Sequence, residues 1–220
     1  MRTALVTGAS KGIGQAIATR LEMGGIRVLM PSRTDMDLSS SDSVEHFVSS
    51  LKENVDILVN NAGINKIAEL DDVTLSNLTE TLQVNLISAF QITQALAQGM
   101  KLRSFGRIVN ISSLWSVVTR PGRASYAMSK SALNGMTRTL AVELAPYKVL
   151  VNAVAPGYVL TDLTRQNNPP HEIERIASSI PLNRLAEPSE IAEVVAFLCS
   201  EANTYLTGQT IIVDGGYSCL

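Results

Sequence analysis

The sequence predicts an α/β fold in which one doubly wound parallel sheet forms a single domain over residues 1–220. Short apolar runs alternate with longer amphipathic segments along the chain, which is the pattern of βαβ units. A glycine-rich turn follows the first apolar run and opens the first amphipathic segment. The chain of 220 residues, with 45% hydrophobic and 17% charged residues, is long and apolar enough for one sizeable core.

Each short apolar run is predicted to be a strand, and these runs cover residues 3–7, 27–31, 55–60, 106–112, 149–155 and 210–213. Between them, the helical spacing of apolar residues predicts helices over 14–24, 43–52, 75–100, 125–145 and 188–201, of which 75–100 is long enough to be interrupted. The stretch from Asp162 to Pro181 contains the sequence Asn-Asn-Pro-Pro at its centre and is predicted to be a mobile loop or lid.

Composition excludes several classes of protein. The net charge of −2 provides no basic excess, so nucleic acid is not expected as the main partner. No apolar run is long enough to span a bilayer, and residues 4–6 read as a strand and not as a leader peptide. Two cysteines, Cys199 and Cys219, suggest a reducing, cytoplasmic setting. With only His46 and His171 available, neither a histidine-rich metal site nor a Ser-His-Asp triad is expected.

The glycine-rich turn, Thr7 to Gly14, lies between a predicted strand and a predicted helix. Gly8, Gly12 and Gly14 permit a tight turn and close approach of the backbone to a pyrophosphate, which the free N–H groups of the helix N-terminus would bind. An ordinary strand-to-helix turn is the alternative, since the spacing differs from G-x-G-x-x-G. The turn favours a Rossmann-type, dinucleotide-binding sheet.

The end of the second predicted strand indicates which dinucleotide is bound. A site for NAD places an acidic side chain there, on the ribose hydroxyls. Here the strand ends in Ser32 and Arg33, whose hydroxyl and guanidinium suit a 2′-phosphate, and Lys11 is expected to reach the same phosphate. The cofactor is therefore predicted to be NADP(H). In the alternative, Arg33 and Lys11 are solvated surface charges, and Asp35 lies near enough to oppose a phosphate.

Tyr126 and Lys130 are one helical turn apart and share a face of the predicted helix. An ammonium beside a phenol favours the phenolate, so Lys130 is expected to lower the pKa of Tyr126 toward neutrality and let it exchange a proton with a substrate oxygen. The alternative is a surface tyrosine and lysine one turn apart. Ser112 and Ser113 stand at the carboxyl end of a predicted strand, where parallel sheets bind ligands.

Six sequence elements occur in one order: TGASKGIG at 7–14, NNAG at 60–63, Asn85, Ser113, Tyr126-Ala-Met-Ser-Lys130 and Pro156-Gly157. In this the chain resembles the short-chain dehydrogenases/reductases over nearly its whole length, and in particular the branch that includes 3-oxoacyl-carrier-protein reductases. The resemblance implies Ser113, not Ser112, as the serine that holds the substrate carbonyl. It also implies that Asn85 holds a water in a relay with Lys130, and that Tyr126 is the general acid or base.

The resemblance also implies which residues contact the cofactor. Lys130 would bond the nicotinamide ribose beside Tyr126, Asp37 would bond the adenine amino group, and Thr161 would bond the nicotinamide carboxamide. The full predicted cofactor-binding set is Gly8, Ser10, Lys11, Gly12, Ile13, Gly14, Ser32, Arg33, Asp37, Leu38, Asn61, Ala62, Gly63, Tyr126, Lys130, Pro156, Gly157, Val159 and Thr161.

The chain departs from this family in two places. Only residues 34–36 separate Arg33 from Asp37, and three residues span about 10 Å at most, so no helix fits there. We therefore expect a sheet short by one strand at this edge and a more open adenine pocket. Ser116 stands where the family often has glycine. Beside it, the single tryptophan, Trp115, is expected either to pack in the core or to form a wall of the substrate site.

The expected activity is interconversion of a ketone and a secondary alcohol by hydride transfer, most simply as a 3-oxoacyl-type carbonyl reductase acting on a small-molecule substrate. Alternatives are a keto-sugar or nucleotide-sugar reductase, an alcohol dehydrogenase working in the oxidative direction, and a non-catalytic NADP-binding regulatory protein. By resemblance, a homotetramer or homodimer is expected. Lys101, Arg103 and Lys148 are candidates for contact with an acidic carrier protein.

Overall fold

The computed structural model describes the backbone of residues 1–220 and all side chains except those of Leu163 and Asn167. Within this chain, a six-stranded, fully parallel sheet has the order β2-β1-β3-β4-β5-β6. The predicted doubly wound sheet is thus confirmed, with strands β1 (Thr3–Val6), β2 (Arg27–Leu29), β3 (Ile57–Asn60), β4 (Gly106–Ile111), β5 (Val149–Pro156) and β6 (Thr210–Val213).

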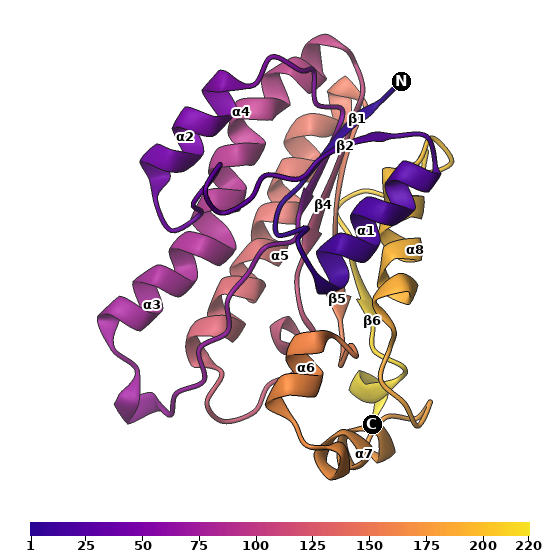
Figure 1. Cartoon of the computed structure of the whole chain (residues 1–220). Helices are drawn as coiled ribbons and strands as arrows, with labels where there is room; N and C mark the ends of the chain where they lie inside the picture. The colour runs from indigo at the N-terminus through magenta and orange to yellow at the C-terminus, as the bar shows by residue number, and fades with distance from the viewer.

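Helices cover both faces of the sheet (Figure 1). On one face, α1 (Gly12–Met23) and α8 (Pro188–Cys199) pack on each other and on the strands through a buried cluster that includes Ile17 and Val195. On the other face, α2 (Ser41–Ser50), α4 (Ser88–Leu102) and α5 (Ala124–Leu144) share a second cluster that includes Ile92 and Leu144. The strand order reverses between β1 and β3, and the crevice beyond the carboxyl ends of such strands is where doubly wound sheets bind ligands.

The long helical segment predicted over 75–100 is confirmed, together with its interruption. It consists of α3 (Leu75–Leu82), a π-helical turn η2 (Gln83–Ile87), and α4, which continues to Leu102. Such π-turns are frequently found at functional sites. This one carries Asn85, whose side chain is buried.

The prediction of an irregular loop over Asp162–Pro181 is wrong, because two helices occupy it: α6 (Asp162–Asn167) and α7 (Pro170–Ser178). The hydroxyl of Thr161 caps α6 by accepting from the amide of Thr164, at 3.2 Å. Pro170 occupies the first turn of α7, where a missing N–H has no effect on helix hydrogen bonding. The Asn-Pro-Pro sequence that suggested a loop is therefore the boundary between two helices, which lie beyond the carboxyl ends of the strands in Figure 1.

The shortened segment after the second strand forms a tight turn. The amides of Asp35 and Met36 both donate to the carbonyl of Ser32, and the side chain of Met36 is buried in the core. The described sheet ends at β2, which is two residues shorter than predicted. The expected loss of a strand at this edge is confirmed.

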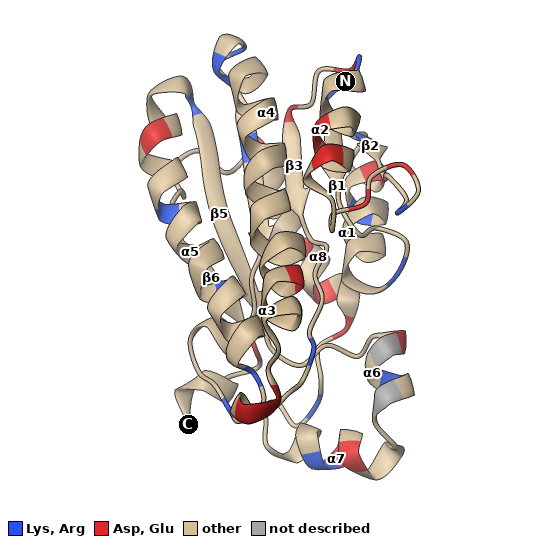
Figure 2. Ribbon diagram, turned by 90° about the vertical axis from the view of Figure 1, so that its left-hand side faces the viewer, with Lys and Arg blue, Asp and Glu red and all other residues tan. Residues whose placement is uncertain are grey.

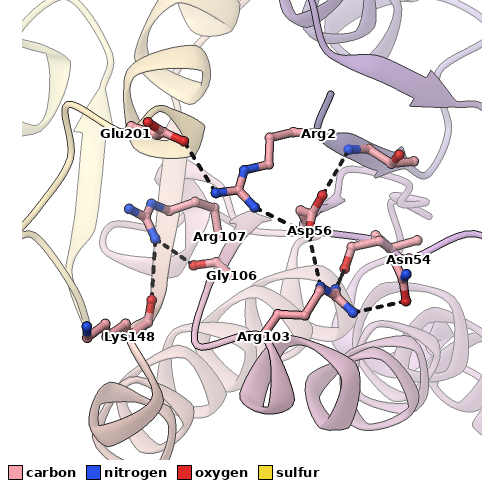
Figure 3. Close-up of polar contacts among 10 residues, drawn as sticks. Arg2, Asn54, Asp56, Arg103, Gly106, Arg107, Lys148 and Glu201 are labelled. Atoms are coloured by element: carbon pink, nitrogen blue, oxygen red, sulfur yellow. Dashed lines mark hydrogen bonds and ion pairs between the residues drawn. The ribbon is translucent and has the colours of Figure 1, made fainter.

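The amino ends of the strands are held by polar contacts far from the predicted site (Figure 3). The carboxylate of Asp56 accepts from Nε of Arg103 at 3.1 Å and from the amide of Thr3 at 3.2 Å. Arg107 is buried and donates to the backbone carbonyls of Gly106, Lys148, Ser200 and Asn203. No helix of the described chain is long and apolar enough to cross a membrane.

Candidate active site

The glycine-rich turn connects β1 to α1 with two residues in the left-handed region, Gly8 at φ 65° and Gly12 at φ 58°. A side chain on Gly14 is excluded by packing, since a Cβ there would lie 2.3 Å from the carbonyl oxygen of Gly8 and 2.4 Å from Nδ2 of Asn61. A Cβ on Gly8 would lie 2.9 Å from Cα of Ala62. The turn therefore packs directly against the segment that follows β3.

The N-terminus of α1 is suited to an anion. No side chain caps it, whereas Ser40 caps α2 and Thr74 caps α3 by accepting from a backbone amide. Ser10 and Lys11 are exposed at this end, and the partly buried Ile13 anchors the helix in the core. Free N–H groups and the positive end of the helix dipole fit the pyrophosphate of a dinucleotide.

Thr7 fixes the relation between the turn and the residues after β3. Its buried hydroxyl accepts from the amides of Asn61 and Ala62, both at 3.0 Å. The side-chain amide of Asn61 in turn donates to the carbonyls of Thr7 and Gly8, at 2.9 and 3.1 Å. The predicted contact residues Gly8, Asn61 and Ala62 are thus brought together, and Thr7, which no sequence pattern marks for this role, holds them there.

The residues after β2 are arranged less simply than predicted. Asp35 accepts from both the hydroxyl and the amide of Ser32, at 2.6 and 2.8 Å, and these bonds lower the pKa of Asp35. Ser32 is therefore already engaged by a carboxylate and is not free to bind a phosphate. Arg33 remains exposed, with its Nε 3.6 Å from the carboxylate of Asp37. A positive and a negative side chain thus lie together at this end of the crevice.

Asp37 and Leu38 follow the turn as predicted. The carboxylate of Asp37 accepts from the amide and hydroxyl of Ser39, at 3.0 and 2.7 Å, and these bonds are the main cause of its lowered pKa. Leu38 packs partly into the core, and its carbonyl accepts from Gln83 at 3.4 Å. The short segment 34–36 therefore still delivers both residues to the edge of the crevice.

Lys130 and Tyr126 lie on one face of α5, as predicted. Nζ of Lys130 is 5.7 Å from the centroid of the Tyr126 ring and donates to the carbonyl of Ile111 at 2.7 Å. Burial lowers the pKa of Lys130 to about 8. The predicted fall in the pKa of Tyr126 is wrong for this structure: burial raises it, and the counteracting influences come from the Ser113 side chain and the Arg123 charge.

Asn85 lies next to Lys130. An ideal Cβ on Gly63 would be 3.3 Å from Oδ1 of Asn85 and 3.4 Å from Nζ of Lys130, so the three residues border one space. The Asn85 amide nitrogen donates to the carbonyl of Ile64 and to Oγ of Ser129, at 2.9 and 3.0 Å. Its oxygen accepts from the amide of Ile64 at 2.8 Å. Both amide donors are thus used within the protein, and the water relay stays a prediction.

Ser113 follows β4 at its carboxyl end and begins a short 3₁₀ turn, η3 (Leu114–Ser116). Its hydroxyl accepts from the amide of Trp115 at 3.2 Å and lies close enough to Tyr126 to influence its pKa. Ser112 instead donates to Ser116 at 3.2 Å and to the carbonyl of Lys130 at 3.3 Å. The structure therefore places Ser113, and not Ser112, beside the tyrosine.

The segment after β5 approaches the glycine turn from the other side. A Cβ on Gly157 would lie 2.7 Å from Cβ of Asp214. Glycine therefore lets the backbone after β5 pass close to Asp214. Pro156 ends β5 and Val159 is buried. Thr161 is adjacent to the turn, because a Cβ on Gly12 would lie 3.4 Å from its Cγ2. Thr161 thus brings the end of the segment 156–161 against the glycine turn, and a shared cofactor crevice stays a prediction.

Trp115 is half-buried and packs against other aromatic rings outside the two large core clusters, and its role as a wall of the substrate site stays a prediction. Its ring makes edge-to-face contacts with Tyr158 and Tyr217, with centroids 5.9 and 6.5 Å apart. It is also flanked by two guanidiniums, those of Arg120 at 5.5 Å and Arg123 at 5.9 Å from the ring centroid. The tryptophan is thus part of an aromatic cluster that continues from Ser113 toward α7.

A family model described as enoyl-(acyl carrier protein) reductase matches residues 30–218. The chain is 38% identical to the 3-oxoacyl-[acyl-carrier-protein] reductase FabG of Aquifex aeolicus (strain VF5), over 98% of this chain and 96% of that protein. The acetoacetyl-CoA reductase of Shinella zoogloeoides is 37% identical over 98% of each chain. This protein belongs to the short-chain dehydrogenase/reductase family. It is an oxidoreductase of that family, whose members bind a nicotinamide cofactor.

Two solved structures share the fold and differ in cofactor. A provisionally assigned NAD(P) dependent gluconate 5-dehydrogenase from Beutenbergia cavernae, with bound NADP, has a TM-score of 0.95, 37% identity, and coverage of 100% of this chain and 97% of that chain. A 4-hydroxyisoleucine dehydrogenase complexed with NADH has a TM-score of 0.94, 26% identity, and full coverage of both chains. Relatives of this short-chain dehydrogenase/reductase therefore include proteins with either nicotinamide cofactor.

Sequence reasoning did not identify Arg123. It stands three residues before Tyr126, is only 8% exposed, and influences the tyrosine electrostatically. No motif marks it, because its contact with Trp115 depends on how the segment between them folds, and Tyr158 comes from another part of the chain. The one available signal was its position just before the Tyr-x-x-x-Lys pattern, on the same helix end.

Proposed function

We propose that this short-chain dehydrogenase/reductase uses NADP(H) to interconvert a ketone and a secondary alcohol, with Tyr126 as general acid and base. The observation that carries this proposal is that Ser113, Tyr126 and Lys130 gather at the carboxyl edge of the sheet, next to a glycine turn that fits a dinucleotide pyrophosphate. Each of these residues performs one part of the proposed reaction.

When bound, NADPH supplies the hydride, so that two electrons reach the carbonyl carbon and the cofactor leaves oxidised. The chain provides the rest. The hydroxyl of Ser113 donates to the substrate oxygen and holds the carbonyl beside Tyr126. The hydroxyl of Tyr126 gives its proton to that oxygen as negative charge develops there. Lys130 positions the cofactor ribose and contributes positive charge beside the phenol, while the alcohol product leaves with the tyrosine proton.

Arg33 and Lys11 support NADP(H) as the cofactor. Both are cationic and exposed, Arg33 at the end of β2 and Lys11 at the N-terminus of α1. A guanidinium and an ammonium on two sides of the ribose suit a 2′-phosphate better than a hydroxyl. Asp35 opposes this preference, because its carboxylate holds Ser32. We therefore propose that Arg33 and Lys11, and not Ser32, bind the 2′-phosphate of NADP(H).

The substrate is a small carbonyl compound. The names of the relatives point to 3-oxoacyl thioesters, whereas the structural neighbour named for gluconate points to a hydroxy acid. The acidic-carrier contact considered for Lys101, Arg103 and Lys148 has little support, because Arg103 is bound to Asp56 and Asn54 at the amino end of the sheet. That end is opposite to Ser113 and Tyr126.

For assembly, we propose a homotetramer of two-fold symmetry, or at least a homodimer, formed through α4 and α5. The ribbons of these helices carry few charges (Figure 2). Phe90 on α4 and Val142 on α5 are 43% and 77% exposed, which is costly for apolar side chains in water. A second copy of the chain would cover them.

The proposed function is tested by following NADPH oxidation with a panel of ketones. The panel contains a 3-oxoacyl thioester, a nucleotide-linked keto-sugar and a small keto acid, and each is tested with NADH as well. Turnover of at least one ketone, faster with NADPH, supports the proposal. Absence of turnover with all of them, in both directions, contradicts it and favours a cofactor-binding protein without catalysis.

A further inference from the structure

Arg123 is a buried cation without a counter-ion. Its side chain lies at the start of α5, the residue is 8% exposed, and its Nε is sealed from solvent without an acceptor. No hydrogen bond or ion pair of its guanidinium is found among the side chains that the structure describes. Burying an unpaired charge costs several kcal/mol in general, so such a group is uncommon unless it has a task.

Arg107, the other buried arginine, shows how this chain satisfies a structural guanidinium. It donates to four backbone carbonyls at distances of 2.9 to 3.4 Å, and Figure 3 shows the bonds to Gly106 and Lys148. Nothing comparable surrounds Arg123. A purely structural role therefore explains Arg107 and leaves Arg123 unexplained.

The surroundings of Arg123 are those of the active site. Its guanidinium is 5.9 Å from the centroid of Trp115 and interacts electrostatically with Tyr126 and Tyr158. Arg120 lies on the same tryptophan, at 5.5 Å, and donates to the hydroxyl of Tyr158 at 3.4 Å. Two cations thus share one aromatic surface, and the pKa of Arg123 is lowered mainly by burial and further by the charge of Arg120.

A carboxylate close to this part of the chain, that of Glu69, does not neutralise the pair. Oε1 of Glu69 lies 3.6 Å from the position of a Cβ on Gly122, between the two arginines in sequence, yet it is within 4.0 Å of neither guanidinium among the ion pairs of the described chain. An anion from outside would neutralise both arginines. Because Arg123 precedes the first turn of α5, which carries Tyr126, and acts electrostatically on that residue, such an anion would be bound near the reacting carbonyl.

We propose that Arg123, assisted by Arg120, binds the carboxylate of the substrate, so that this enzyme acts on a small keto acid and its hydroxy acid. The proposal rests on the proposed function and narrows its substrate class. Trp115 and Tyr158 form the apolar wall along the carbon chain between the carboxylate and the ketone. A guanidinium pairs with a carboxylate through two parallel hydrogen bonds, which gives orientation as well as affinity.

The test compares keto acids with their own methyl esters, because each pair shares the same ketone and chain length and the ester lacks the negative charge. Acetoacetate, 4-oxopentanoate and 5-oxohexanoate vary the distance between ketone and carboxylate. With wild-type enzyme and NADPH, kcat/KM is expected to favour the acid over its ester by about tenfold or more for at least one length. In Arg123→Gln this preference is expected to disappear, mainly through KM, and Arg123→Lys should restore part of it. Arg138→Gln, an exposed change on the same helix, should keep the preference.

Binding is also read without turnover, since Trp115 is the single tryptophan and lies beside Arg123. Its fluorescence should change saturably with the keto acid and not with the ester, and the change should be lost in Arg123→Gln. Saturable binding of the acids without turnover would support the anion site and contradict the proposed function. Turnover of the esters as efficient as that of the acids at every length, with Arg123→Gln unchanged, would overturn the anion site and leave the function intact.

A thermal melt separates this role from a structural one. Removing an uncompensated buried charge should leave Tm unchanged or raise it in Arg123→Met, whereas Arg107→Met should lower Tm because it frees four buried carbonyls. An equal loss of Tm in both variants would show Arg123 to be structural and would overturn the proposal.

Discussion

Nζ of Lys130 lies 5.7 Å from the centre of the Tyr126 ring, and its hydrogen bond goes to the carbonyl of Ile111. The ammonium therefore stands beside the phenol without bonding to it. Burial acts on both groups in opposite ways, lowering the pKa of Lys130 to about 8 and raising that of Tyr126. The cation that acts most directly on the tyrosine in this structure is Arg123.

The buried lysine predicts a pH dependence of stability. Its pKa falls from 10.5 in the unfolded chain to about 8 in the folded protein, so between these values the unfolded chain binds more protons. The free energy of unfolding contributed by this group therefore rises with pH across that window, and the penalty is fully present below pH 8. Relative to Lys130→Met, the wild type should gain on the order of 1–3 kcal/mol between pH 8 and pH 10.

Denaturant unfolding at several pH values measures this gain. A constant stability difference between wild type and Lys130→Met over the whole range would mean that Lys130 keeps its ordinary pKa in the fold.

Alanine is expected to have opposite effects on stability at Gly14 and at Gly135. A Cβ on Gly14 would lie 2.3 Å from a backbone oxygen, so Gly14→Ala should lower Tm and abolish cofactor binding by forcing the turn open. A Cβ on Gly135, in the middle of α5, would meet only the end of the Arg138 side chain, at 3.9 Å. Gly135→Ala should stabilise the fold by about 0.5–1 kcal/mol through helix propensity. Thermal melts and cofactor titrations check both; a tolerated Gly14→Ala would disprove the close packing of the turn.

The cofactor preference is predicted to depend on two neighbouring charges. Arg33→Ala should raise KM for NADPH about tenfold and leave that for NADH nearly unchanged, because only the 2′-phosphate is lost as a partner. Asp35→Asn should move the preference further toward NADPH, because it removes the negative charge of the carboxylate that accepts from Ser32. Steady-state kinetics with both cofactors decides this. Equal use of NADH by the wild type, or unchanged NADPH affinity in Arg33→Ala, would contradict the assignment.

The assembly is predicted to be dimeric or tetrameric at micromolar concentration. Phe90→Asp and Val142→Asp introduce charge into the exposed apolar positions of α4 and α5 and should shift the protein toward monomer. Leu102→Asp, at the end of α4, is a matched change of an exposed apolar residue. Light scattering gives the mass directly, and a monomeric wild type would rule out this arrangement.

Much of the fold could be predicted because its signals are local. The alternation of apolar runs and amphipathic segments predicts the six strands and most of the helices. The short spacing between Arg33 and Asp37 predicts that the sheet lacks one strand at this edge. The segment 162–181 was misjudged because Asn and Pro favour both loops and helix starts. Only the position of Pro170 in the first helical turn distinguishes the two.

The site was predictable where its residues belong to a motif, as Ser113, Tyr126 and Lys130 do. The direction in which the pKa of Tyr126 shifts could not be predicted, because burial depends on the surrounding fold and outweighs the neighbouring charge. Two further features could not be predicted, because they depend on where side chains point and not on sequence spacing. These are the hydrogen bond from Ser32 to Asp35 and the absence of an acceptor for Nε of Arg123.

Tyr126→Phe is the variant that bears most directly on the chemistry. It keeps the ring, its packing and its distance from Lys130, and removes only the hydroxyl that exchanges the proton. With the best ketone of the panel, single-turnover reduction by this variant should fall at least a hundredfold, while NADPH binding, measured by fluorescence, stays within about twofold of the wild type. Retention of more than about a tenth of wild-type turnover would show that another group transfers the proton.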